Sequence, residues 1–385
     1  MNYGSPESSD LKLTLSIGMK YRVKCDIFKC FPSIYTHAID WALIGKSKAK
    51  NNRNGKICSW SHEIDTLAEN TTNGETHGLI IGPHTSNLLS EIILCRVDES
   101  LINEGYTFVR FIDDYWCYAN SLEEANSFPF ALDKNLSLYG LSINQKKTEF
   151  STLPETNQEE WVRTLQDCQS EKEILSVPEV RKILDTAIHQ TNTMNGKASC
   201  INYALKMIAK KPLKSSAKHY LARTGSHLLY LYPYLINLAD DYIFHPANMT
   251  PGQISYISNL LFDKSMRERD FLSCCYALYF AIIYEFSIDN IAFSDIEKSS
   301  DCILMLLSWI YAKEKNMDDL ESNLHETARN LYINNSFDTH WLFVYEVLER
   351  GDFSNNDSSW RALKKAKVSF IDANAFKRKS RPAHS

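Results

Sequence analysis

The chain has 385 residues, 44% of them hydrophobic and 23% charged, which is enough for two well-buried domains. Its formal net charge of −5 excludes a global positive field that would gather nucleic acid by itself, and its ten cysteines contain no Cys-x-x-Cys pair that would indicate a zinc module. Without an apolar run of membrane-spanning length or a secretory leader, we expect no membrane partner and a cytoplasmic location.

The first informative element is residues 21–26. Tyr21, Val23 and Cys25 alternate with basic residues, as on a half-buried strand. The strand ends at Asp26, whose carboxylate would project from the end of a sheet.

The next segment is glycine-rich and precedes a helical pattern. Residues 78–87 contain Gly78 and Gly82, and apolar residues then recur at helical spacing up to Leu101. A helix that starts near Thr85 or Ser86 would present free amides and its positive dipole end to a phosphate or a template. An ordinary helix N-terminus after a loop explains the segment equally well.

Residues 107–112 and 115–119 are rich in aromatic and β-branched types, which predicts two strands joined by an Asp113-Asp114 turn. If the sheet brings Asp26 beside this turn, the three carboxylates form an all-oxygen site for divalent ions. Two magnesium ions there would activate an attacking 3′-hydroxyl and stabilise departing pyrophosphate. A solvated turn is the alternative.

Residues 122–150 predict an amphipathic helix, a turn and a strand. Lys147 lies in the turn region. An ammonium group at this point could neutralise phosphate charge or donate a proton to pyrophosphate. A solvated lysine on an edge strand is the alternative.

Residues 171–370 show successive helical patterns, one of them over 215–242, and no convincing strand alternation, which favours an irregular array of helical repeats. The predicted organisation is a domain at 1–155, a linker at 156–170, helical repeats at 171–370 and a basic tail at 371–385. Most tyrosines of this half are expected in the core, with a stacking platform for single-stranded DNA as the alternative.

Four segments resemble, in order and spacing, the palm motifs of reverse transcriptases. The segments are Asp26–His37, Gly82–Ser86, Phe111–Asp114 and Gly140–Thr148. The resemblance covers roughly residues 20–150 and implies an α+β palm domain.

The resemblance also implies a role for individual residues. Asp26, Asp113 and Asp114 would be metal ligands assisted by the Ile27 carbonyl. Phe31 lies where the family excludes a ribose 2′-hydroxyl, which favours deoxynucleoside triphosphates. The residues expected to contact template and nucleotide are Gly82, Pro83 and Ser86.

The Ile81-Gly82-Pro83 variant and the helical second half resemble bacterial abortive-infection and related defence-associated reverse transcriptases. That branch implies a magnesium-dependent DNA polymerase of antiphage defence, with manganese as a possible substitute. Many reverse transcriptases carry glutamine where Ile81 stands. Ile81 lacks the side-chain amide that would bond to the incoming nucleotide or template, so DNA synthesis without a template is expected. The partners implied are deoxynucleotides, single-stranded DNA or RNA, and further copies of the chain.

Only 25 residues precede Asp26, where related polymerases place a fingers region. We therefore expect the fingers to be largely missing, as in a truncated product or a fragment of a longer protein. Two alternatives remain open: a templated RNA-directed DNA polymerase of the retron or intron type, and a fingers-less, non-catalytic scaffold that binds nucleic acid.

Overall fold

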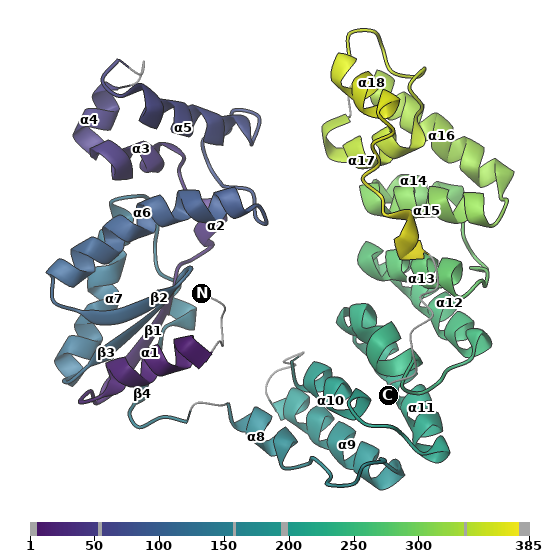
Figure 1. The fold of residues 1–385 in the computed structure, drawn as a ribbon, viewed down its shortest axis with the longest axis horizontal. Helices are drawn as coiled ribbons and strands as arrows, with labels where there is room; N and C mark the ends of the chain where they lie inside the picture. Colours follow the sequence, from purple (N-terminus) through teal and green to yellow (C-terminus); the bar gives the residue numbers. More distant parts are fainter. Residues whose placement is uncertain (1–5, 53–55, 157–158, 194–198, 335–336, 377–385) are drawn as a thin grey trace. The chain divides into compact units, whose positions relative to one another are not determined.

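The computed structural model describes residues 6–52, 56–156, 159–193, 199–334 and 337–376 (Figure 1). The chain divides into two compact units, Met1–Asn157 and Gln158–Ser385, and each has its own hydrophobic core. None of the helices described is both long enough and apolar enough to cross a bilayer.

The N-terminal unit contains one antiparallel sheet with the strand order β2-β3-β1-β4. The strands are β1 (Tyr21–Asp26), β2 (Thr107–Phe111), β3 (Asp114–Ala119) and β4 (Glu149–Thr152). Val23 and Cys25 are fully buried, which confirms the alternation predicted for β1. The two central strands, β1 and β3, pair along their whole length.

Helices cover both faces of this sheet. The helices described in this unit are α1 (Pro6–Ser16), α2 (Cys30–Ser33), α3 (His37–Ile44), α4 (Lys46–Asn51), α5 (Ser59–Asn70), α6 (His84–Asn103) and α7 (Leu122–Ser137), with a 3₁₀ turn η1 at Gln145–Lys147. The apolar face of α7 packs with α6 on one side of the sheet, as Figure 1 shows. On the other side Leu11 and Leu15 of α1 pack against Phe111 and Tyr118.

Local chemistry explains where α7 begins and which face it buries. The hydroxyl of Ser121 accepts a hydrogen bond from the Glu124 amide at 3.1 Å, so it caps the first turn. Phe128, Leu132 and Leu136 follow at four-residue spacing and are fully buried. The amphipathic helix predicted for this stretch is confirmed.

The described part of the C-terminal unit is helical. Its elements are α8 (Glu160–Gln166), α9 (Val177–Thr193), α10 (Ser199–Ala209), α11 (Ser215–Leu231), η2 (Pro233–Leu238), η3 (Asp240–Phe244), α12 (Pro251–Glu268), α13 (Phe271–Ile283), α14 (Phe293–Ser299), α15 (Cys302–Glu314), α16 (Asp318–Ile333), α17 (Phe337–Val347), α18 (Ser358–Lys365) and η4 (Ala373–Phe376). Side-chain caps start several of them, among them the Thr250–Gln253 capping box of α12 and the Asp301 cap of α15. The core consists of three successive clusters, as expected of helices that mainly pack against sequence neighbours.

Three predicted boundaries are wrong. The interval 156–170, predicted as a linker, contains α8, whose Trp161 and Leu165 are buried in the core of the C-terminal unit. The single helix predicted at 215–242 ends at Leu231, because Pro233 lacks the amide that would continue it. A 3₁₀ segment and a π-helix follow.

The basic tail predicted at 371–385 is also wrong in its first residues. The Tyr279 hydroxyl donates a hydrogen bond to the Ala375 carbonyl, and the rings of Tyr279 and Phe376 lie 6.0 Å apart. Residues 371–376 therefore belong to the folded unit, and residues 377–385 lie outside the described part of the chain.

Candidate active site

The sheet brings Asp26 and the acidic hairpin together. Asp26 is the last residue of β1 and Asp114 the first of β3, and the two are direct partners in the antiparallel register. The Ile27 amide donates a hydrogen bond to the Asp113 carbonyl at 3.2 Å. Asp26 and the distant pair Asp113 and Asp114 thus lie at one end of the two central strands.

The hairpin turn is shifted by one residue from the prediction. Phe111 pairs with Asp114, so the two turn residues are Ile112 and Asp113 rather than Asp113 and Asp114. Ile112 adopts a φ of +57°, which is rare for a β-branched residue, but two-residue hairpin turns require positive φ. Asp113 therefore lies at the apex, whereas Asp114 belongs to a strand.

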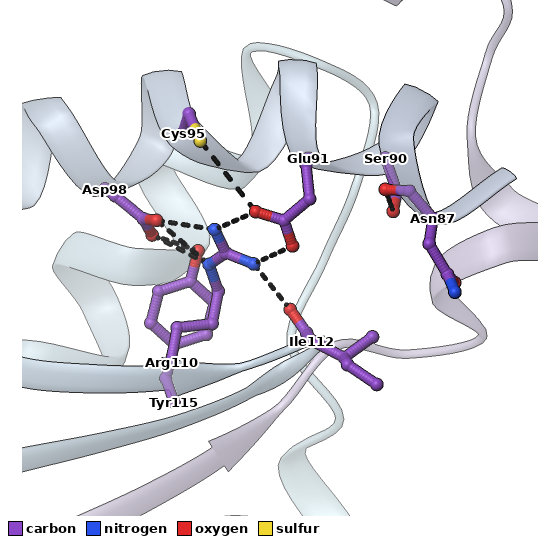
Figure 2. A network of polar contacts seen from close by, with 8 residues as sticks. All are labelled: Asn87, Ser90, Glu91, Cys95, Asp98, Arg110, Ile112 and Tyr115. Atoms are coloured by element: carbon purple, nitrogen blue, oxygen red, sulfur yellow. Dashed lines mark hydrogen bonds and ion pairs between the residues drawn. The ribbon is translucent and has the colours of Figure 1, made fainter. Parts of the chain in front are cut away.

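A buried arginine braces this strained turn, as Figure 2 shows. Arg110 donates through Nη1 to the Ile112 carbonyl at 2.8 Å and to Glu91 Oε1 at 2.6 Å. Its Nη2 donates to Glu91 Oε2 at 2.8 Å and to Asp98 Oδ2 at 2.7 Å, and the Tyr115 hydroxyl also donates to Asp98. Helix α6, which carries both acids, is thereby tied to the β2–β3 hairpin.

The electrostatics of this network favour its charged form. Burial opposes the charge of Arg110, yet hydrogen bonds to Glu91 and Asp98 outweigh it and raise the arginine pKa. The same hydrogen bonds from Arg110 lower the pKa of Glu91. Burial raises the pKa of Tyr115, which keeps its hydroxyl protonated as the donor to Asp98.

Polar partners surround the carboxylates of the strand ends. Asp26 accepts a hydrogen bond from the Asn144 side chain at 3.2 Å, and Lys147 Nζ lies 3.3 Å from its other oxygen. Lys24 Nζ lies 3.8 Å from Asp114 Oδ1. Lys147, singled out in the sequence, is therefore beside Asp26, and its side chain is 66% exposed.

The donor set fits a divalent cation. The pKa of Asp113 is raised, first by burial and then by the negative charges of Asp114 and Asp26. A hard cation such as magnesium would relieve this repulsion, and oxygen atoms are its preferred ligands. Lys147 lies beside Asp26 and Lys24 beside Asp114, so a cationic side chain lies next to two of the three carboxylates.

The predicted substrate-binding residues lie on two linked segments. Phe31 is half-buried in α2 and packs against the core of the N-terminal unit. The backbone amides of Gly78 and Leu79 bond to the carbonyls of Ile34 and Phe31, at 2.8 and 2.9 Å. The segment that leads to Gly82 is therefore fastened to the segment that carries Phe31.

The segment before α6 is exposed, and so are most residues of the first turn of α6, whereas Ser86 is buried. Gly82 has a φ of +120° and Pro83 precedes the first residue of α6, and both are exposed. Ser86 is only 7% exposed, so its side chain packs within the fold. No side chain caps the start of α6, which begins at His84 rather than at Thr85 or Ser86.

Sequence reasoning missed the residues that hold the acids in place. Arg110 stands alone among apolar residues of β2, and such a buried charge requires partners. Glu91 and Asp98 are seven residues apart on one face of α6, which is a signal that could have identified them. Nothing in the sequence marks Asn144, because its role depends on the pairing of distant strands.

Most aromatic residues of the C-terminal unit are packed in its core, as predicted. Tyr220, Tyr230 and Tyr232 lie against the buried cluster that follows α8. Two tyrosines that pack against this cluster also reach a pocket, which Tyr203, Tyr242, Lys206 and Lys210 line. Lys206 Nζ lies 5.8 Å from the Tyr242 ring centroid, a combination that base stacking would use.

The chain was compared with known proteins. A family model described as reverse transcriptase (RNA-dependent DNA polymerase) matches residues 3–203, just over half of the chain. No curated protein matches the chain.

Proposed function

Because this chain belongs to the reverse transcriptase family of RNA-dependent DNA polymerases, we propose that it polymerises deoxynucleotides at Asp26, Asp113 and Asp114. The observation that carries the proposal is the strand register. It pairs Asp26 with Asp114 and bonds Ile27 to Asp113, so that all three acids meet at one end of the sheet. The raised pKa of Asp113 supports the proposal, because a cation bound there would favour the charged carboxylate.

Asp26, Asp113 and Asp114 would hold two magnesium ions, with the Ile27 carbonyl as a further oxygen ligand and manganese as a possible substitute. When bound, these ions supply a Lewis acid that favours the ionised 3′-hydroxyl and the pyrophosphate leaving group. Lys147, whose side chain is 66% exposed, would neutralise charge on the pyrophosphate or donate a proton to it.

The remaining residues are proposed to shape the nucleotide site. The half-buried ring of Phe31 would form the wall that rejects a ribose 2′-hydroxyl. The exposed backbone at Gly82 and Pro83 would approach the nucleotide or template. Ser86, being buried, would act by holding the first turn of α6 rather than by direct contact.

We further propose that the protein acts in antiphage abortive-infection defence, in the bacterial cytoplasm and as a homo-oligomer. The support is the Ile81-Gly82-Pro83 variant together with the helical unit that follows the first domain. Ile81 lacks the side-chain amide that would bond to a nucleotide or template, which favours synthesis without a template. Single-stranded DNA or RNA would be the partner.

The test is DNA synthesis by the purified chain with magnesium and each labelled deoxynucleotide, with and without RNA or primer. Wild type is expected to make polymer, and Asp113→Asn to make none, because one ligand to the metal is lost. Asp185→Asn, the same change on the exposed face of α9, is the matched control and should retain activity.

The outcomes separate the alternatives. Polymer made only with a complementary RNA would identify a templated enzyme of the retron or intron type. Equal synthesis by wild type and Asp113→Asn would refute the assignment of the site. A folded wild-type chain that binds nucleic acid and makes no polymer would instead be a scaffold.

A further inference from the structure

We propose a second divalent-metal site, formed by His37, Asp65 and Glu69, which takes a transition-metal ion such as zinc. His37 is the first residue of α3, and the two acids lie one turn apart on α5. The potential ligand atoms of the three side chains all lie within 4.8 Å of one another. The site is distinct from the group formed by Asp26, Asp113 and Asp114.

Two carboxylates of the cluster share one imidazole nitrogen. The Nδ1 atom of His37 lies 2.6 Å from Asp65 Oδ2 and 3.2 Å from Glu69 Oε1, so two carboxylates converge on one nitrogen. A single N–H group cannot serve both. Among the described residues, neither acid forms an ion pair with a lysine or an arginine.

Asp65 gives an independent sign of a missing ligand. The residue is 4% exposed, and its Oδ1 atom is buried without a hydrogen-bond partner. A buried carboxylate oxygen with no donor is unfavourable, because it has lost its water and gained nothing in return. A cation in the cluster would satisfy this oxygen and neutralise both acids.

The ligand chemistry favours a transition metal over magnesium or calcium. One imidazole nitrogen and two carboxylates are typical ligands of zinc, whereas magnesium and calcium take oxygen atoms. Ligands about 2.1 Å from a tetrahedral ion lie about 3.4 Å apart, so the 3.2 Å from His37 Nδ1 to Glu69 Oε1 already comes close. The 2.6 Å contact between His37 Nδ1 and Asp65 Oδ2 must lengthen by about 0.8 Å.

The surroundings provide access and support. The His37 side chain is 40% exposed and that of Glu69 is 22% exposed, so an ion can enter and water can complete its coordination. The Thr36 hydroxyl donates to Glu69 Oε1 at 3.4 Å, and the Thr36 amide bonds to the Thr76 carbonyl at 2.9 Å. A bound ion would therefore fasten α5 to the segment that leads from β1 into α3.

The test is zinc binding by the full-length chain after metal removal with EDTA. Bound zinc is counted by mass spectrometry after gel filtration, and the melting temperature is measured with and without zinc. Compared with wild type, His37→Gln and Glu69→Gln should each lose one equivalent of zinc and most of the zinc-dependent rise in melting temperature. His62→Gln and Glu63→Gln, on the same helix but outside the cluster, should behave like wild type.

Cobalt(II) distinguishes this site from the acids of the hairpin. Its visible absorption bands should form in wild type and in Asp113→Asn, and should be absent in His37→Gln. If His37→Gln fails to fold in EDTA, Glu69→Gln decides. Unchanged zinc stoichiometry and cobalt spectra in the folded variants would mean that the cluster is only an ion pair, and would overturn the proposal.

Discussion

At the scale of single residues, Asp113 and Asp114 show how the backbone gives two adjacent acids different environments. Asp113 stands at the apex of a strained turn and its pKa is raised, whereas Asp114 begins a strand opposite Asp26 and faces Lys24. A carboxylate with a raised pKa is unfavourable in its charged form. The fold tolerates this cost at the proposed site, as is common where function needs a poised charge.

Because the charged form of Asp113 is unfavourable in the folded state, Asp113→Asn should stabilise the metal-free protein. The neutral form of Asp113 favours folding below the carboxyl pKa of the unfolded chain, and that contribution is lost as pH rises through the raised pKa of the folded state. Asparagine stays neutral, so at pH 7 in EDTA the variant should melt about 1–3 °C higher than wild type.

The pH dependence is the decisive measurement for this prediction. The difference in melting temperature between wild type and Asp113→Asn should shrink as pH falls toward 4. Added magnesium should stabilise wild type more than the variant. A variant that melts lower than wild type in EDTA at pH 7 would show that Asp113 makes favourable contacts as an anion.

At the scale of elements, the site depends on the attachment of α6 to the β2–β3 hairpin. Arg110 carries this attachment, since its guanidinium reaches two acids of α6 and the carbonyl of the strained Ile112. Its side chain is only 9% exposed, so water cannot replace these partners. The position of Asp113 in the turn therefore rests on a helix more than a dozen residues earlier in the chain.

Arg110→Gln should lower the free energy of unfolding by roughly 2–3 kcal/mol, because Asp98 and Glu91 lose their buried counter-charge. Urea unfolding followed by tryptophan fluorescence measures this loss. Arg96→Gln is the matched control on α6, where the arginine is 48% exposed, and should cost no more than about 1 kcal/mol. Equal losses of unfolding free energy in Arg110→Gln and Arg96→Gln would contradict the bracing role. If DNA synthesis is observed, Arg110→Lys should lower its rate even under conditions in which the variant stays folded.

At the scale of the whole molecule, the chain has separate cores rather than one. The buried residues of the N-terminal unit form clusters around its sheet, and those of the C-terminal unit form clusters along its helices. Within the latter, Gly225 of α11 lies against Ile243 of η3, where an added Cβ would be 2.5 Å from the isoleucine Cγ2 atom. This close contact joins two elements of the C-terminal unit, α11 and η3.

Gly225→Ala should therefore destabilise the C-terminal unit alone. The steric cost of about 1–3 kcal/mol exceeds the gain of roughly 1 kcal/mol from better helix propensity. Hydrogen exchange should accelerate in α11 and η3 and stay unchanged in β1 and β3. Gly252→Ala, where nothing lies within 4 Å of the new methyl group, should instead be neutral or slightly stabilising, and accelerated exchange in the sheet would refute separate cores.

The sequence by itself determined the local elements and the chemistry that they carry. Alternation at Tyr21, Val23 and Cys25 predicts β1, and helical spacing predicts α7, because each period shows which face of the element is apolar. The order of the four motifs also predicted the polymerase family, and the matching family model bears this out. Each of these signals can be recognised along the chain without knowledge of which distant segments pack together.

Only the tertiary structure decided which elements pair and where each segment ends. The Ile112-Asp113 turn follows from the pairing of Phe111 with Asp114, which local propensity does not specify. Helix α8 forms in the predicted linker because Trp161 packs into the core of the C-terminal unit. Arg110, Asn144 and His37 form their contacts with residues that are distant in the sequence. A sequence shows which surface must be buried, but the partner of that surface is settled only when distant segments pack together.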